Sequence, residues 1–226
     1  MSTGNSFTRF WALYPHQPPG HRVNRAVVGC LTLLLAGILL SLWLFLHLKS
    51  QEKPFEEVKG YRIASEESFD NFLRSGSNRE RVEALRRYLE DRGLGEVTPV
   101  KNLLRQGDEW LELKEPPFSI PPRNQWNNMA DTLELLRDQI VPLIGPVEVI
   151  SGFRSDSYNR KLEHSDKAQH RNFCALDLIP KSNISHRELA EELRALHARL
   201  GPESNFGLGL GDGVRFHIDT CGYRTW

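Results

Sequence analysis

The longest hydrophobic stretch of the chain runs from Ala26 to Leu46 and contains no charged residue. As a helix rising ~1.5 Å per residue, this stretch would be about 31 Å long, which matches the ~30 Å hydrocarbon core of a bilayer. A cleaved signal peptide has a shorter apolar region and a small-residue cleavage site, and no such site follows Leu46. The pattern therefore predicts one uncleaved transmembrane helix, at residues 26–48, after a tail of residues 1–25.

Basic residues flank both ends of the expected span. They are Arg9, Arg22 and Arg25 before it, and Lys49, Lys53 and Lys59 after it. The positive-inside rule is therefore nearly balanced. The part of the chain that is able to fold lies on the C-terminal side, which favours a cytoplasmic tail, a single pass through the inner membrane and a domain on the periplasmic or extracellular side.

Beyond the span, apolar residues recur at intervals of three and four in several segments, as in helices with one buried face. Helices are predicted in a short segment opening at Ser65, from Arg79 to Arg92 with Gly93 after it, from Asn124 to Val141 with Pro142 and Gly145 ending it, and from the capping box at Ser185 to Leu200. The charged stretch 49–60 has no such period, and we interpret it as a juxtamembrane spacer.

Short apolar or alternating runs predict four strands, at Val147–Ile150, Cys174–Ile179, Phe206–Leu210 and Val214–Thr220. The last two are joined by the tight turn 211–213, so they should pair as an antiparallel hairpin. The proline-rich segment 116–122 fits neither a helix nor a central strand and marks a boundary. The expected fold class is therefore α+β, with a small antiparallel sheet and flanking helices in a domain at 116–226, preceded by a spacer and helical segment at 49–115.

Composition and charge narrow the function classes. Lys and Arg together number 29, as do Asp and Glu, so no net field attracts nucleic acid and no nucleic-acid partner is expected. A hydrophobic fraction of 39% with 26% charged residues is typical of a folded protein. Oligomeric state is left open by the sequence.

The three cysteines, Cys30, Cys174 and Cys221, are too few for a disulfide framework or a four-thiolate zinc site. Strand alternation would place Cys174 opposite Asp177, but Cys221 on the face of His217. We therefore expect two buried free thiols rather than a disulfide between them, which an oxidising compartment would still permit. Any metal site must use histidine and carboxylate ligands.

Three residues could provide such ligands. His170 and Asp177 lie seven apart across the start of a predicted strand, and Asp177 and His217 fall on strands that could pair. Neutral imidazole and carboxylate oxygen both suit zinc. The spacing alone is weak, because eight histidines offer chance pairs and a lone Asp in an apolar run is often a core polar group.

The residues around these positions form a longer pattern. It comprises Ser151-Gly152-Phe153-Arg154-Ser155, Tyr158-Asn159, Gln169-His170, Ala175-Leu176-Asp177 and Phe216-His217-Ile218-Asp219-Thr220. This pattern resembles the D-Ala-D-Ala carboxypeptidase family of zinc metallopeptidases, which shares its fold with lysostaphin-type endopeptidases and the hedgehog signalling domain. The C-terminal end is most similar to the branch of murein endopeptidase K. The resemblance covers about residues 116–226 and implies the same fold there.

The resemblance implies a zinc ion held by His170, Asp177 and His217. Asn159 is then expected to hold its loop by hydrogen bonds. Gln169 is expected to orient the neighbouring histidine ligand. The implied partner is the peptide stem of peptidoglycan.

The resemblance also implies catalytic roles. Arg154 would point toward a carboxylate or carbonyl of the substrate, a task suited to a planar guanidinium, with a structural salt bridge as the alternative. Asp219 is preferred as the general base, although it could equally be a partner that orients a ligand. Many family members carry an acidic residue three positions before the last histidine, where this chain has Val214. Asp212, in the turn just before, is the other candidate for the general base.

The leading hypothesis is a membrane-anchored zinc peptidase that hydrolyses stem peptides or cross-links of peptidoglycan. Ala168 and Phe173 replace a Ser and a Gly of the pattern, and together with Val214 they keep open a non-catalytic wall-binding or scaffolding protein. Such a structural metal site would be closed by a fourth ligand, for which His164 is the candidate. A third hypothesis is a tethered interaction protein that works through the helix at 79–94.

Overall fold

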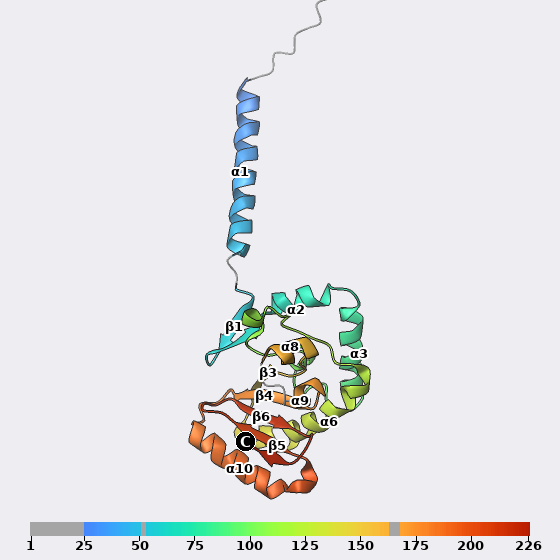
Figure 1. Cartoon of the computed structure of the whole chain (residues 1–226). Coiled ribbons are helices and arrows are strands. Elements are labelled where there is room, and N and C mark those ends of the chain that lie inside the picture. Colours follow the sequence, from blue (N-terminus) through green and yellow to red (C-terminus); the bar gives the residue numbers. More distant parts are fainter. Residues whose placement is uncertain (1–24, 51–52, 163–167) are drawn as a thin grey trace, which may run out of the picture. The chain divides into compact units, whose positions relative to one another are not determined.

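The computed structural model describes residues 25–50, 53–162 and 168–226. The chain divides into two compact units, Met1–Glu52 and Lys53–Trp226. The described part of the first unit is helix α1 (Arg25–Ser50), which is long and apolar enough to cross a membrane (Figure 1). An N-terminal signal sequence would meet the same criteria of length and composition.

The second unit contains helices and strands in an α+β arrangement. Its elements are β1 (Phe55–Val58), β2 (Tyr61–Ala64), α2 (Glu66–Leu73), α3 (Asn78–Glu90), α4 (Val100–Leu103), α5 (Trp110–Leu113), η1 (Arg123–Gln125), α6 (Trp126–Leu135), η2 (Leu136–Ile140), α7 (Val141–Ile144), β3 (Val147–Ser151), α8 (Asp156–Lys161), α9 (Ala168–Arg171), β4 (Ala175–Pro180), α10 (His186–Leu200), η3 (Pro202–Ser204), β5 (Gly207–Leu210), β6 (Phe216–Asp219) and β7 (Arg224–Thr225). Strands β1 and β2 form a separate hairpin, and the other five form one sheet in the order β3-β4-β6-β5-β7.

The five-stranded sheet is mixed rather than wholly antiparallel. Strands β3, β4, β6 and β5 pair antiparallel, as expected, but β7 runs parallel to β5. The expected antiparallel pairing is therefore confirmed for these four strands, and the edge strand β7 departs from it. Strand β7 was not predicted because it contains only two residues, too few for a hydrophobic pattern to reveal a strand.

The two faces of the sheet differ in character because side chains alternate along each strand. On one face Leu176, Leu208 and Ile218 join the hydrophobic core. Helices α6 and α10 pack against the sheet, α6 at β4 and α10 at β5 (Figure 1). On the other face, the side chains of β4, β5 and β6 are mostly small or polar, and they include Asp177 and His217.

Local sequence features account for the helices that were predicted. Ser65 caps α2 by accepting a hydrogen bond from the Ser68 backbone N–H at 3.2 Å, and Ser185 caps α10 through the N–H of Glu188 at 3.2 Å. In α3, the expected apolar face at Val82, Leu85 and Leu89 is buried. Because that face is occupied by the core, the structure gives no support to a partner-binding role for the helix at 79–94.

Pro142 does not end the third predicted helix. The short π-helix η2 interrupts the α-helical hydrogen bonding. Pro142 then occupies the first turn of α7, where a missing N–H costs least. The helical segment continues to Ile144 and ends at Gly145, whose φ of 82° suits glycine.

The stretch interpreted as a spacer contains part of the β1–β2 hairpin. Phe55 pairs with Ala64, and the chain reverses at Lys59 and Gly60, which both have positive φ. Residues 53–115 belong to the same compact unit as 116–226, so the expected boundary at 116 does not divide the structure.

Cys174 and Cys221 form a disulfide, with their Cα atoms 6.2 Å apart. The expectation of two free thiols was therefore wrong. Strand alternation does not apply to Cys221, because β6 ends at Asp219 and the cysteine lies in the turn that follows. Cys30, in α1, is an exposed free cysteine.

Candidate metal centre

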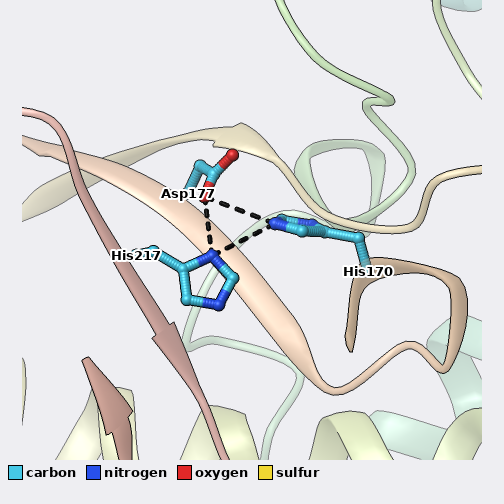
Figure 2. Close-up of side chains that lie close together, drawn as sticks. All are labelled: His170, Asp177 and His217. Carbon is cyan, nitrogen blue, oxygen red and sulfur yellow. Dashed lines mark hydrogen bonds and ion pairs between the residues drawn. The ribbon is translucent and has the colours of Figure 1, made fainter. Parts of the chain in front are cut away.

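Three side chains that are far apart in the sequence converge at one point on the polar face of the sheet. Helix α9 supplies His170, β4 supplies Asp177 and β6 supplies His217 (Figure 2). The Nε2 atom of His170 lies 3.3 Å from Asp177 Oδ1 and 3.2 Å from His217 Nδ1, and the latter two atoms are 2.9 Å apart. All three residues are buried, and the group could hold a metal ion.

Strand pairing brings two of the three ligands together. Asp177 and His217 are Cα partners in the antiparallel pair β4–β6, and Gly209 of β5 is the next residue in the same row. A Cβ at Gly209 would lie 2.7 Å from the ring of Trp226, so the missing side chain makes room for the indole. The Trp226 ring in turn lies 5.0 Å from the ring of His217.

The third ligand arrives through a tight turn after α9. The N–H of Phe173 donates to the carbonyl of His170 at 3.3 Å, and Cys174 N–H donates to Gln169 O at 3.1 Å. Phe173 has a φ of 55°, a left-handed conformation that glycine adopts most readily. Its side chain is buried against Phe153, with ring centroids 6.0 Å apart, so packing offsets the backbone strain.

Hydrogen bonds behind the two histidines fix which nitrogen faces the centre. His170 Nδ1 lies 2.7 Å from the backbone carbonyl of Gly152, so it carries the proton and leaves Nε2 free to bind a cation. His217 Nε2 lies 3.1 Å from Asp219 Oδ2, which in the same way leaves Nδ1 facing the centre. A carbonyl or carboxylate in this position is typical of histidines that bind metals.

Asp219 therefore lies behind His217 rather than in front of it. Its side chain is fully buried, and its two oxygens accept hydrogen bonds from Arg224 at 2.8 Å and from the Cys221 N–H at 2.9 Å. Gly207 leaves room for this carboxylate, because a Cβ there would lie 2.3 Å from Asp219 Oδ2. The preferred assignment of Asp219 as general base does not fit this position, whereas the alternative of a partner that orients a ligand does.

Arg154 is also engaged by the protein itself. Its Nη2 lies 2.5 Å from Asp177 Oδ2, and its Nε donates to Gln106 O and Ser151 Oγ, both at 2.9 Å. The guanidinium is buried, so these contacts match the structural salt bridge that was the alternative to a substrate contact. Arg154 also lines the cavity at the site, so a molecule bound in the cavity could contact it.

Electrostatics favour an ionised Asp177 and a neutral His170, whereas they favour the protonated form of His217. Burial opposes the ionisation of Asp177, but the neighbouring His170 and Arg154 hold the pKa of its carboxyl well below the usual range. Burial, with Arg154 adding to it, lowers the pKa of His170 to about 4, so this ring is neutral at physiological pH. Burial also acts to lower the pKa of His217, but hydrogen bonds with Asp177 and Asp219 outweigh it and raise that pKa.

A cavity of about 570 Å³ opens in front of Asp177 and His217. The other residues that line it are Tyr61, Glu109, Arg154, Asn159, Leu162, Gly209, Leu210, Gly211, Asp212, Gly213, Arg215, Phe216 and Trp226. Two of them are carboxylates outside the ligand set, Glu109 and Asp212. The cavity is therefore large enough for part of a peptide and has both charged and aromatic walls.

Sequence analysis missed Arg215, Glu109, Tyr61 and Trp226. Arg215 bridges Asp177 Oδ2 at 2.8 Å and Asp108 Oδ1 at 3.0 Å. It lies two residues before His217, so strand alternation could have placed it on the ligand face. The other three come from the hairpin, the segment before α5 and the C-terminus, and no sequence pattern links those segments to the site.

The remaining predicted residues have varied positions. Asn159 is buried beside the cavity, and its side-chain oxygen has no partner within the described part of the chain. The backbone carbonyl of Gln169 accepts a hydrogen bond from the Cys174 N–H. The His170 ring is oriented by the backbone carbonyl of Gly152. His164 lies outside the described residues.

Comparisons of the chain with protein-family models, with curated proteins and with solved structures found no match.

Proposed function

We propose that this chain is a membrane-anchored, zinc-dependent peptidase that hydrolyses amide bonds in the stem peptides or cross-links of peptidoglycan. The observation that carries the proposal is the triangle formed by His170 Nε2, Asp177 Oδ1 and His217 Nδ1. Ligands ~2.0–2.1 Å from a tetrahedral zinc ion lie about 3.3 Å from one another. The three observed separations of 3.3, 3.2 and 2.9 Å are close to that value.

The donor set among the described residues also suits a catalytic zinc ion. Two neutral imidazoles and one carboxylate suit zinc, and catalytic sites keep three protein ligands and one open position. Within the described residues, the group that could hold the ion has three members. When bound, zinc would polarise the scissile carbonyl and acidify a water molecule enough for attack near neutral pH.

The protein's own residues have distinct tasks in this proposal. Gly152 O and Asp219 hold the two imidazole rings in the orientation that presents a lone pair to the ion. Arg154 and Arg215 hold the second oxygen of Asp177, so that only Oδ1 faces the ion. Substrate would bind in the cavity in front of these ligands, where binding positions the scissile bond.

Two further observations support a location outside the cytoplasm. Helix α1 is long and apolar enough to anchor the chain. The Cys174–Cys221 disulfide is typical of proteins in oxidising compartments such as the periplasm. Peptidoglycan as the substrate is supported by the resemblance of the sequence motifs to D-Ala-D-Ala carboxypeptidases.

One observation favours a second candidate, a non-catalytic wall-binding protein with a structural metal ion. Asp219 is withdrawn behind His217, and Val214 replaces the acid that many family members carry. A protein without any proton acceptor near the ion would bind zinc without hydrolysing peptides.

The test uses the full chain in detergent, incubated with purified peptidoglycan in the presence of zinc or a chelator. We expect zinc-dependent release of fragments, whose masses identify the cleaved bond. His170→Ala should abolish release, whereas His186→Ala, an exposed histidine at the start of α10, should not change it. Binding of one equivalent of zinc with no fragments released would instead support the wall-binding candidate.

A further inference from the structure

Hydrolysis of an amide needs a group that takes a proton from the attacking water and delivers it to the departing amine. Asp219 cannot do this from behind His217, and Val214 has no proton-accepting group. Apart from the ligand Asp177, the carboxylates that line the cavity within the described part of the chain are Glu109 and Asp212. Among the described residues, the choice of proton acceptor is therefore between these two.

Glu109 is held in place by the same loop that orients the metal site. The carbonyl of Gln106 accepts from Ser151 Oγ at 2.7 Å and from Arg154 Nε at 2.9 Å, and its side-chain oxygen accepts from the Ser155 N–H at 2.8 Å. These hydrogen bonds attach the segment just before Glu109 to the residues at the end of β3 and after it. Glu109 therefore follows a segment that the protein holds in place.

Asp108 provides a second tether. Its carboxylate binds Arg215, and the other end of that guanidinium binds Asp177. The chain of contacts from Asp108 to a metal ligand has two links, of 3.0 and 2.8 Å. Glu109, the next residue, lines the same cavity as Asp177 and His217.

Tyr158 of α8 orients the Glu109 carboxylate. The phenol donates to Glu109 Oε2 at 3.2 Å, and burial raises the pKa of Tyr158, so the phenol stays protonated. Gly107 makes this approach possible, because a Cβ there would lie 2.4 Å from the Tyr158 hydroxyl. This hydrogen bond engages Oε2 and not the other oxygen, Oε1.

The environment of Glu109 suits proton transfer better than that of Asp212. Burial raises the pKa of Glu109, the negative charge of Asp108 adds to the effect, and the charges of Arg215 and Arg154 oppose it. A base whose pKa is raised toward neutrality is more effective near pH 7. Asp212 is exposed in the turn between β5 and β6, and nothing in the described part of the chain holds its carboxylate.

We propose that Glu109 is the residue that accepts the proton of the attacking water and donates it to the leaving amine, which rests on the peptidase function proposed above. A water oxygen in the cavity forms a bond to the scissile carbonyl carbon, and its proton passes to Glu109 Oε1. The protonated carboxyl then gives that proton to the amide nitrogen, the C–N bond breaks, and a carboxyl group and an amine are released. Glu109 ends the cycle ionised, as it began.

The test compares the wild-type protein and four variants with one substrate, a cross-linked muropeptide dimer obtained by muramidase digestion of peptidoglycan. The variants are Glu109→Gln, Glu109→Asp, Asp212→Asn and the control Glu112→Gln, whose exposed carboxylate lies in α5 and pairs with Arg62. For each protein kcat, KM, bound zinc and the thermal unfolding midpoint are measured. Zinc content and the unfolding midpoint show whether a variant is folded.

We expect Glu109→Gln to lower kcat by about 100- to 10,000-fold while KM changes by less than about threefold and one equivalent of zinc stays bound. The acid limb of the kcat/KM profile, where activity rises as Glu109 loses its proton, should also disappear. Glu109→Asp should restore that limb with part of the activity. Glu112→Gln should retain kcat, and Asp212→Asn should lower kcat by less than about tenfold and keep the acid limb.

Each contrary outcome has a distinct meaning. If the wild-type protein cleaves the dimer and Glu109→Gln keeps its kcat, the assignment of Glu109 is wrong and the peptidase function stands. A rise in KM alone would make Glu109 a substrate-binding residue, and loss of kcat only in Asp212→Asn would make Asp212 the proton carrier. If the wild-type protein with bound zinc cleaves no bond in the dimer or in intact peptidoglycan, both proposals fail. If Glu109→Gln does not fold, the result for Glu109→Asp decides, since unchanged kcat and an unshifted acid limb in that variant would overturn the assignment.

Discussion

Asp177 and His217 are opposite one another on the antiparallel strands β4 and β6, with Asp177 Oδ1 2.9 Å from His217 Nδ1. Strand pairing alone therefore sets two of the three ligands, and only His170 must be delivered by a turn. The other oxygen of Asp177 is occupied by Arg154 and Arg215. The Asp177 carboxylate thus connects the candidate ion site with the charged wall of the cavity.

Asp177→Asn should remove zinc binding and also destabilise the metal-free protein. The amide cannot replace the negative ligand, and it removes the anionic partner of Arg154 and one of the two carboxylates that bind Arg215. Removing one member of a buried ion pair costs about 3–5 kcal/mol. Zinc titration calorimetry and urea unfolding measure the two effects, with the exposed Asp131→Asn of α6 as the control. Retained stoichiometric zinc binding in Asp177→Asn would contradict the assignment of this ligand.

Asp219→Asn should weaken zinc binding, but it should not lower kcat as the loss of a general base would. Partners that orient a metal-bound histidine typically contribute about 10–100-fold in metal affinity. We therefore expect zinc affinity to fall by that factor, while kcat at saturating zinc falls far less than in Glu109→Gln. An Asp219→Asn protein with full zinc occupancy and a kcat reduced by more than about 100-fold would instead restore Asp219 as the proton carrier.

Zinc affinity should depend on the titration of a single histidine. Protons compete with the metal for His217, whose pKa is raised, chiefly because hydrogen bonds with Asp177 and Asp219 outweigh burial. His170, with a pKa lowered to about 4, is already neutral and releases no proton. Affinity should thus fall about tenfold for each pH unit below the pKa of His217 and level off above it.

The number of protons released on zinc binding measures this directly. Calorimetry in buffers of different ionisation enthalpy, at pH values around 6, should give a release approaching one proton per zinc ion. Release of two protons would show that both histidines are charged in the metal-free protein. Asp219→Asn should shift the pH dependence to lower pH, because it removes one of the two carboxylates that favour the protonated ring.

Loss of the Cys174–Cys221 disulfide should destabilise the protein by about 4 kcal/mol, the chain-entropy value for a bridge with a sequence separation of 47. The comparison is between urea unfolding of a Cys174→Ser/Cys221→Ser double variant and of Cys30→Ser, which changes only a free cysteine of α1. The Cys221 N–H also holds Asp219, so zinc affinity should fall in the double variant as well. An unfolding free energy equal to that of the wild type would show that the bridge does not form in solution.

The elements that could be predicted are those whose determinants are local. Ser65 and Ser185 supply helix caps, and the apolar face of α3 shows the helical period within one segment. The hairpin β1–β2 escaped prediction because its turn uses Lys59 and Gly60 rather than the usual Asn-Gly pair, and its strands have four residues each.

The ligand set could be proposed because the short motifs around His170, Asp177 and His217 resemble those of a metallopeptidase family, and each motif lies within one segment of the chain. The role of Asp219 could not, because strand alternation puts it on the same face as His217 whether it faces the ion or holds the ring from behind. The partners of Asp219 decide between the two, and they come from the turn at Cys221 and from Arg224 in β7. Those contacts form only when the C-terminal segment folds back beside β5.

By itself, the sequence determined the apolar helix and the α+β class, because hydrophobic period and capping act over a few residues, and it indicated the three candidate ligands through short motifs that resemble a known family. Only the tertiary structure decided that Glu109 lines the cavity, that Arg154 is held by Asp177, and that Cys174 is bonded to Cys221. The physical reason is that these relationships join segments tens of residues apart. Their distances depend on how the sheet, the loop after β3 and the C-terminus pack together, which no local pattern encodes.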